Sequence, residues 1–147
     1  MYDWVKRLND TIADAKKKAK EEGQAALKEA FLELFEVQPK LKGVYWTQYT
    51  PYFNDGEPCY FRVNEAYLSA EWTKEEDAEH SSDDMHFEYP STWKATDEEK
   101  ATKEPVYKAV RELFAAIPDE VMEATFGDHV EVIATREGFE VNDYSHD

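Results

Sequence analysis

The chain has 147 residues, 41% of them apolar and 14% aromatic, which is enough for one folded domain. Its formal net charge of −16 is uneven, because residues 1–42 carry +1 whereas residues 43–147 carry −17. This charge argues against direct binding of an extended nucleic acid, which requires lysines and arginines to neutralise phosphates. It favours solubility, a cationic partner or the exclusion of something anionic.

The sequence shows no sign of a membrane segment or a secretory signal. No apolar run approaches the roughly 18–20 residues of a membrane span, and the first ten residues, MYDWVKRLND, lack the pattern of a signal peptide. The single cysteine, Cys59, cannot form an internal disulfide and is interpreted as a small buried hydrophobic residue. We therefore expect a cytoplasmic protein with no membrane partner.

Within the N-terminal segment 1–42, residues 3–37 are predicted to be helical, because apolar residues recur at spacings of three and four. Gly23 favours two helical segments that meet there over one continuous helix, and Pro39 ends the pattern. The lysines at 16, 17, 18 and 20 are interpreted as a solvated helix face, because Glu21 and Glu22 follow them. The apolar positions are Trp4, Val5, Leu8, Ile12, Ala15 and Ala19, then Ala26, Leu27, Ala30, Phe31, Leu34 and Phe35.

Residues 43–72 have the composition of strands, with nine of the chain's 21 aromatic residues mixed with Val and Thr. We predict strands at 43–50, 58–64 and 66–72, and a turn at Asn54-Asp55-Gly56. Strand alternation puts Val44, Trp46 and Gln48 on one face of the first strand, which we expect to be the core. The other face carries Tyr45, Thr47 and Tyr49.

That second face is a candidate ligand-binding site made of Tyr45, Tyr49, Tyr60 and Arg62. Tyrosine and arginine are enriched at binding hot spots, because each offers a large contact area with a polar tip. Aromatic stacking beside an arginine is also how proteins hold nucleotides. The alternative is that a helix covers this face and the tyrosines belong to the core.

Residues 73–100 contain ten acids and three lysines and are predicted to form an exposed acidic loop, anchored by a short strand at 85–89. The candidate partner-binding residues are its carboxylates: Glu75, Glu76, Asp77, Glu79, Asp83 and Asp84. His80, Asp83, Asp84 and His86 have the chemistry of a divalent metal site but match no familiar ligand spacing. We therefore predict a solvated loop without a metal or other cofactor.

Two helices are predicted within 104–127. The first begins at Glu104-Pro105, because proline is favoured in a first helical turn, and the second follows Pro118 and stops at Gly127. Beyond them, a C-terminal hairpin over 129–144 is predicted to turn at Arg136-Glu137-Gly138. Its expected core residues are Val130, Val132, Ala134, Phe139 and Val141.

The order of helices, strands, helices and strands predicts a single α+β domain over 1–147, with a mainly antiparallel sheet and helices packed on one face. No phosphate-binding loop or nucleophile elbow is present. We expect a non-enzymatic protein whose acidic surface binds and blocks a basic protein, in particular a nucleic-acid-binding one. In size, acidity and lack of a catalytic motif the chain resembles phage-encoded anti-restriction and anti-CRISPR inhibitors that mimic nucleic acid, a resemblance of composition alone.

Two alternatives remain open. The chain could bind a small molecule or nucleotide through the Tyr/Arg face, with the acidic segment as a lid. It could also be a metal-assisted enzyme built around the segment from His80 to His86. The acidity itself could serve only solubility.

Overall fold

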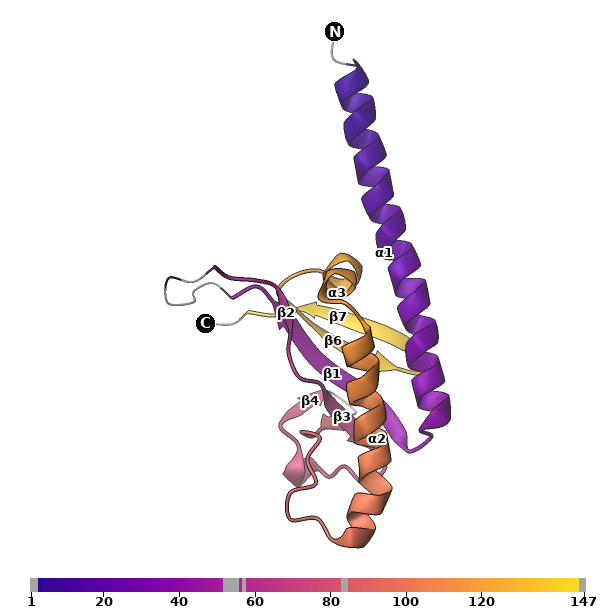
Figure 1. Cartoon of the computed structure of the whole chain (residues 1–147), viewed down its shortest axis with the longest axis vertical. Coiled ribbons are helices and arrows are strands. Elements are labelled where there is room, and N and C mark those ends of the chain that lie inside the picture. The colour runs from indigo at the N-terminus through magenta and orange to yellow at the C-terminus, as the bar shows by residue number, and fades with distance from the viewer. Residues whose placement is uncertain (1–2, 52–55, 57, 83–84, 146–147) are drawn as a thin grey trace.

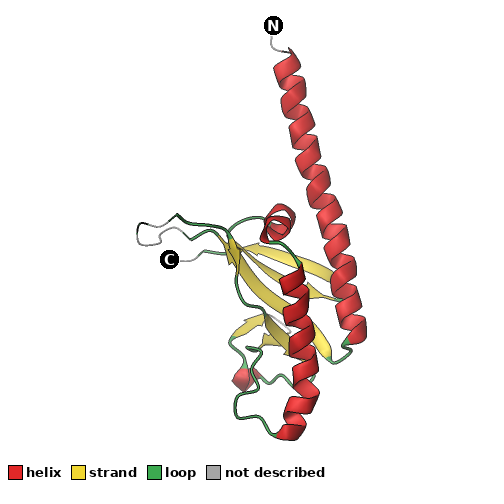
Figure 2. Cartoon of the chain, in the orientation of Figure 1, coloured by secondary structure: helices red, strands yellow, loops and turns green. Residues whose placement is uncertain are grey.

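The structure is a computed structural model that describes residues 3–51, 56, 58–82 and 85–145. Within these residues, three α-helices and a five-stranded antiparallel sheet form the fold, and a two-stranded hairpin lies beside the sheet (Figure 1; Figure 2). The predicted α+β class with an antiparallel sheet is confirmed.

The sheet is built around β1 (Leu41–Tyr49). On one side β1 pairs with β6 (Val130–Thr135), which pairs in turn with β7 (Gly138–Asp143). On the other side it pairs with two short strands in succession, β3 (Tyr67–Ala70) along its first half and β2 (Arg62–Val63) at its end. The strands predicted at 58–64 and 66–72 are therefore shorter than expected and together form one interrupted partner for β1.

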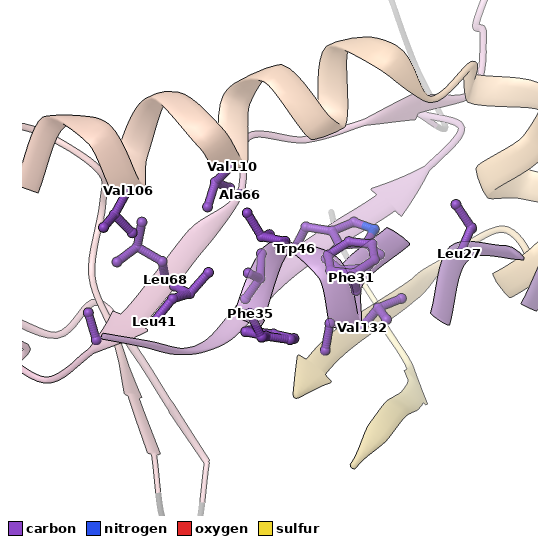
Figure 3. Packing of buried hydrophobic residues seen from close by; sticks show 14 of the residues in the cluster. Leu27, Phe31, Phe35, Leu41, Trp46, Ala66, Leu68, Val106, Val110 and Val132 are labelled. Atoms are coloured by element: carbon purple, nitrogen blue, oxygen red, sulfur yellow. The ribbon is translucent and has the colours of Figure 1, made fainter. Parts of the chain in front are cut away.

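The helices α1 (Asp3–Val37), α2 (Asp97–Ala116) and α3 (Asp119–Phe126) pack on one face of the sheet. The centre of this core is Trp46, which is fully buried and stacks on Phe31 with 5.6 Å between ring centroids. Figure 3 shows Phe31 and Phe35 of α1 and Val110 of α2 in one buried cluster with Trp46. The main apolar residues supplied by the helices are Leu27, Phe31, Phe35, Val106, Val110, Met122 and Phe126.

Strand alternation assigned the faces of β1 correctly, because Val44, Trp46 and Gln48 are all buried beneath the helices. The expectation for Val141 was wrong, since 39% of this residue is exposed. Its register partner is Val132, so Val141 is on the core face, but β7 is the last strand of the sheet. An edge position leaves this side chain beyond the reach of the helices.

The prediction of two N-terminal helices was wrong, because α1 runs without interruption through Gly23. The glycine is needed for a close approach to α3. A Cβ atom at Gly23 would lie 2.5 Å from Oγ1 of Thr125, which is too close for any unstrained contact. Gly23 therefore marks a helix crossing and not a helix end.

The start predicted for the first of the later helices was also wrong, because α2 begins at Asp97 and contains Pro105 in its interior. Thr96 caps the helix by accepting a hydrogen bond from the Glu99 amide at 3.1 Å. Hydrogen bonds from Thr96 also hold the pKa of the Glu99 carboxyl below its usual value. Pro105 lacks an N–H and forfeits one helical hydrogen bond, which the remaining turns of α2 offset.

The segment 73–100 is more ordered than the loop predicted for it. It contains a short 3-10 helix η1 (Glu75–Asp77) and a hairpin of β4 (His80–Ser82) and β5 (Met85–Phe87), before α2 begins. The predicted strand at 85–89 thus exists in part, and its partner β4 was not foreseen. A bridge between Leu68 and Glu88 connects the hairpin to β3.

The turn of the C-terminal hairpin is one residue shorter than predicted, because Thr135 and Gly138 are already register partners. Arg136 in this turn donates hydrogen bonds to the main-chain carbonyl oxygens of Leu41 at 2.9 Å and Phe35 at 3.1 Å. A guanidinium at this place also complements the negative C-terminal end of α1. The turn therefore joins the hairpin to the end of the long helix.

Candidate functional site

The β4–β5 hairpin covers part of the face of the sheet opposite the helices, which we call the outer face. His80 stacks on Tyr45 with 4.6 Å between ring centroids and meets Tyr67 edge-on at the same distance. Phe87 is fully buried beside Tyr45 but lies outside the main core cluster. A Cβ atom at Gly43 would lie 2.5 Å from Sδ of Met85, so the glycine leaves room for the methionine side chain. The hairpin is held against the sheet by aromatic stacking and by this close packing of Met85 over Gly43.

A groove of about 640 Å³ lies between the hairpin and the outer face of β6 and β7. Its lining combines aromatic rings with carboxylates, and no lysine or arginine is among the described residues that line it. We call it the acidic groove. The lining residues used below are Tyr45, His80, Glu131, Glu137, Glu140 and Asn142.

Glu131 is the central carboxylate of the acidic groove. Tyr45 donates a hydrogen bond of 2.8 Å to its Oε2 atom. Burial raises the pKa of the Tyr45 hydroxyl well above its usual value, and the hydrogen bond to Glu131 raises it further. Tyr45 thus stays a neutral donor at physiological pH, and its hydrogen bond fixes the orientation of the Glu131 carboxylate.

A second carboxylate lies close to Glu131 across the strand pair. In the register of β6 and β7, Glu131 is opposite Asn142 and Ile133 is opposite Glu140. Glu131 and Glu140 are therefore diagonal neighbours on the same face, which puts their Cβ atoms roughly 7 Å apart. Two carboxylates at this separation repel each other and favour a cation bound between them.

The structure divides the residues of the predicted Tyr/Arg site. Tyr45 lies under the β4–β5 hairpin, with 6% of its surface exposed, so a hairpin and not a helix covers it. Tyr49 and Arg62 are register partners at the far end of β1, where Tyr49 stacks on Tyr144. Tyr60 is 67% exposed and precedes β2. The structure brings Tyr49 and Arg62 together and separates them from Tyr45.

The predicted partner-binding carboxylates lie beside the hairpin. Glu75, Glu76 and Asp77 form η1 and are exposed, as is Glu79. Burial raises the pKa of the Tyr67 hydroxyl, and the negative charge of Glu79 raises it further. Glu79 therefore lies close to the aromatic cluster of Tyr45, Tyr67 and His80. The last two predicted residues, Asp83 and Asp84, lie outside the described residues.

The two histidines of the metal site considered as an alternative lie on opposite faces of the β4–β5 hairpin. His80 pairs with Phe87 and stacks on the sheet, whereas His86 pairs with Ser81 and shares a 2.9 Å hydrogen bond with its hydroxyl. Adjacent register positions of a hairpin lie on opposite faces, so these two rings cannot bind one ion. Within the described part of the chain, no three His, Cys, Asp or Glu side chains lie close enough together to hold a metal.

Sequence reasoning missed Tyr67, Glu131 and Glu140 as site residues. Alternation alone would have put Glu131 and Glu140 on the outer face, since their neighbours were expected in the core. The register of the strands was needed to make them neighbours, and the docking of the hairpin was needed to make a groove.

A smaller pocket of about 260 Å³ opens between α2, α3 and the segment before β3. Its floor is apolar, with Ala66, Val110 and Met122, and Arg111 lies at its rim.

No helix among the described residues is long and apolar enough to cross a lipid bilayer. Comparison with protein-family models, curated proteins and solved structures found no match to this chain.

Proposed function

We propose that this chain is a non-enzymatic interaction protein that captures an arginine- or lysine-bearing segment of a basic partner in the acidic groove. The observation that carries the proposal is the lining of the groove by three glutamates and several aromatic rings, with no lysine or arginine among the described residues that line it. A guanidinium forms paired hydrogen bonds with a carboxylate and stacks on aromatic faces. The groove offers both kinds of contact.

The proposal extends to a partner that normally binds nucleic acid. The net charge of −17 over residues 43–147 steers a basic surface toward the chain, and complementary charge raises the rate of association. Occupation of that surface would exclude phosphate, so the protein would act as an inhibitor of the nucleic-acid-mimic type. A cytoplasmic location and a role against a host defence system, as for phage inhibitors, belong to the same proposal.

The direct test uses a hexa-arginine peptide as the probe, with hexa-lysine beside it, and measures affinity by calorimetry at several salt concentrations. We expect Glu131→Gln combined with Glu140→Gln to weaken arginine binding by about tenfold or more, which corresponds to about 1.4 kcal/mol. The control combines Glu120→Gln with Glu123→Gln on α3, which removes the same charge from exposed positions outside the groove. Equal losses in both double variants would refute the groove as the site.

The exposed carboxylates of η1 test the contribution of long-range steering. Reversal of Glu75, Glu76 and Asp77 to lysine should slow association with the peptide while leaving the dissociation rate unchanged, because these residues flank the groove without lining it. The fold should tolerate the change, since exposed substitutions rarely cost more than about 0.5 kcal/mol each. An altered dissociation rate would instead make η1 part of the contact.

A further inference from the structure

The N-terminal half of α1 extends away from the rest of the molecule (Figure 1). Every described side chain from Lys6 to Glu22 is exposed, and Leu27 is the first buried residue among the side chains of the helix that the structure describes. A lone helix of this length is only marginally stable in water, because tertiary packing supplies most helical stability. The segment therefore calls for a surface that the described part of the chain does not provide.

The residue types along this segment follow a coiled-coil pattern. Positions 5, 8, 12, 15 and 19 are Val, Leu, Ile, Ala and Ala, with spacings of three, four, three and four. This is the a and d repeat along which two helices pack side by side. The three larger residues come first and the two alanines come last.

We propose that two copies of this chain pair through residues 5–19 of α1, with the two helices antiparallel. In the antiparallel register position 8 faces position 19 of the other copy, and position 12 faces position 15. These two layers each combine a large residue with an alanine and fill the space evenly, while Val5 lies opposite Glu22 at the end of the seam. A parallel pair would oppose large residues to each other at one end and alanines at the other.

Charge favours the same orientation. Residues 3–14 hold three acids and two bases, whereas residues 15–20 hold four lysines and no acid. An antiparallel pair brings the lysine cluster of one helix beside the weakly acidic segment of the other, while a parallel pair would bring two lysine clusters together. The antiparallel arrangement also puts residues 43–147 of the two copies, each with a net charge of −17, at opposite ends of the helix pair, where they repel each other less.

The mass of the full chain in solution tests the pairing. Sedimentation equilibrium should show twice the 17.2 kDa of one chain at high concentration, with dissociation on dilution. Ala15→Glu at a seam position should leave the chain monomeric, whereas Ala13→Glu, an equal change at another exposed position of the helix, should not. A wild-type chain that stays monomeric up to the highest soluble concentration, or equal behaviour of the two variants, would overturn the proposal.

Cysteine cross-linking tests the orientation in a Cys59→Ser background. A mixture of Leu8→Cys and Ala19→Cys chains should form a disulfide-linked pair under mild oxidation, and each variant alone should form little. Cross-links within each single variant, without a cross-link between the two variants in the mixture, would show a parallel pair and refute the antiparallel arrangement. Arginine-peptide binding at the acidic groove should be unchanged in Ala15→Glu, so this test and that of the proposed function fail independently.

Discussion

A single buried amide connects the sheet to α3. Gln48 is fully buried; its Oε1 accepts a hydrogen bond of 2.9 Å from Trp46, and its Nε2 donates to the main-chain oxygens of Met122 at 2.9 Å and Gly127 at 2.8 Å. These bonds satisfy polar groups that have no access to water. The alternation of β1 placed Gln48 correctly in the core, but its partners are 74 and 79 residues away in sequence and could not be foreseen.

We predict that Gln48→Leu, which keeps the approximate size, destabilises the protein by about 3 kcal/mol because it leaves buried groups without partners. Chemical denaturation measures this free energy of unfolding. The matched control is Gln24→Leu, since Gln24 is exposed and makes one long hydrogen bond of 3.5 Å to Thr125. A loss for Gln48→Leu no larger than that of the control would contradict the role given to the amide.

Asp128 holds the end of β1 against the start of β6 and should make stability depend on pH. Partial burial raises the pKa of its carboxyl, but hydrogen bonds of 2.7 Å from both the hydroxyl and the amide of Thr50 more than offset this, so the pKa lies below its usual value. A carboxyl with a lowered pKa in the folded state stabilises the protein above the unfolded-state pKa. That contribution is lost as the pH falls through the folded-state value.

We therefore expect Asp128→Asn to lower the melting temperature at neutral pH. The difference from the wild-type protein should stay constant down to about pH 5 and shrink below about pH 4. Thermal unfolding at a series of pH values measures it. A difference that grows toward acid pH would contradict the assigned sign.

The elements show where sequence patterns were sufficient and where they were not. Periodicity identified the helical and strand segments and the faces of β1, because burial on one face imposes a period on the sequence. It misjudged Gly23 and Pro105, because both are locally unfavourable in a helix and are tolerated for reasons outside the segment. The Thr96 and Glu99 pair was a readable signal for the start of α2, which the proline obscured.

The hairpin of β4 and β5 could not be predicted from its composition. The alternation of Met85 and Phe87 predicted one strand, but ten acids in 28 residues concealed its partner β4, and the docking of Phe87 depends on Tyr45 more than 40 positions earlier. The candidate site could not be predicted for the same reason, because it also depends on contacts between residues far apart in the sequence. Tyr45 was recognised as a site residue from its type, but its hydrogen bond to Glu131 arises from the pairing of β1 with β6.

The crossing of α1 and α3 gives a prediction at the scale of elements. Alanine at position 23 should favour the helix by about 1 kcal/mol in isolation, but its Cβ would meet Thr125 Oγ1. We expect Gly23→Ala to be destabilising overall, by about 1–3 kcal/mol, because the helices must move apart. Thr125→Ala should lower the free energy of unfolding by less than the loss of a buried, hydrogen-bonded hydroxyl usually does, since Oγ1 has no hydrogen-bond partner among the described residues.

The double variant of Gly23→Ala with Thr125→Ala provides the control. Removal of the hydroxyl opens the space that the new methyl group needs, so the double variant should recover most of the stability lost in Gly23→Ala. Denaturant unfolding of the four proteins completes a double-mutant cycle. Additive losses would show that the two positions do not contact each other.

At the scale of the molecule, the two faces of the sheet have separate roles. The helices cover one face and build the apolar core, while the other face carries the aromatic cluster, the hairpin and the acidic groove. Among the described residues, the few ion pairs are local, such as Lys103 with Glu99 on α2 at 3.6 Å. Most described carboxylates of residues 43–147 therefore add negative charge that no ion pair among the described residues neutralises.

This charge predicts a stability that rises with salt. At a net charge of −16 the folded chain repels itself, and counterions screen that repulsion within a Debye length of about 10 Å at 0.1 M salt. We expect the melting temperature to rise by several degrees between about 0.02 and 0.3 M NaCl, which corresponds to about 1–2 kcal/mol for a chain of this size. Reversal of Glu75, Glu76 and Asp77 to lysine changes the net charge from −16 to −10 and should flatten the salt dependence. Magnesium chloride at equal ionic strength is the control: an equal rise identifies screening, whereas saturation at submillimolar magnesium would reveal a specific cation site and refute self-repulsion as the cause.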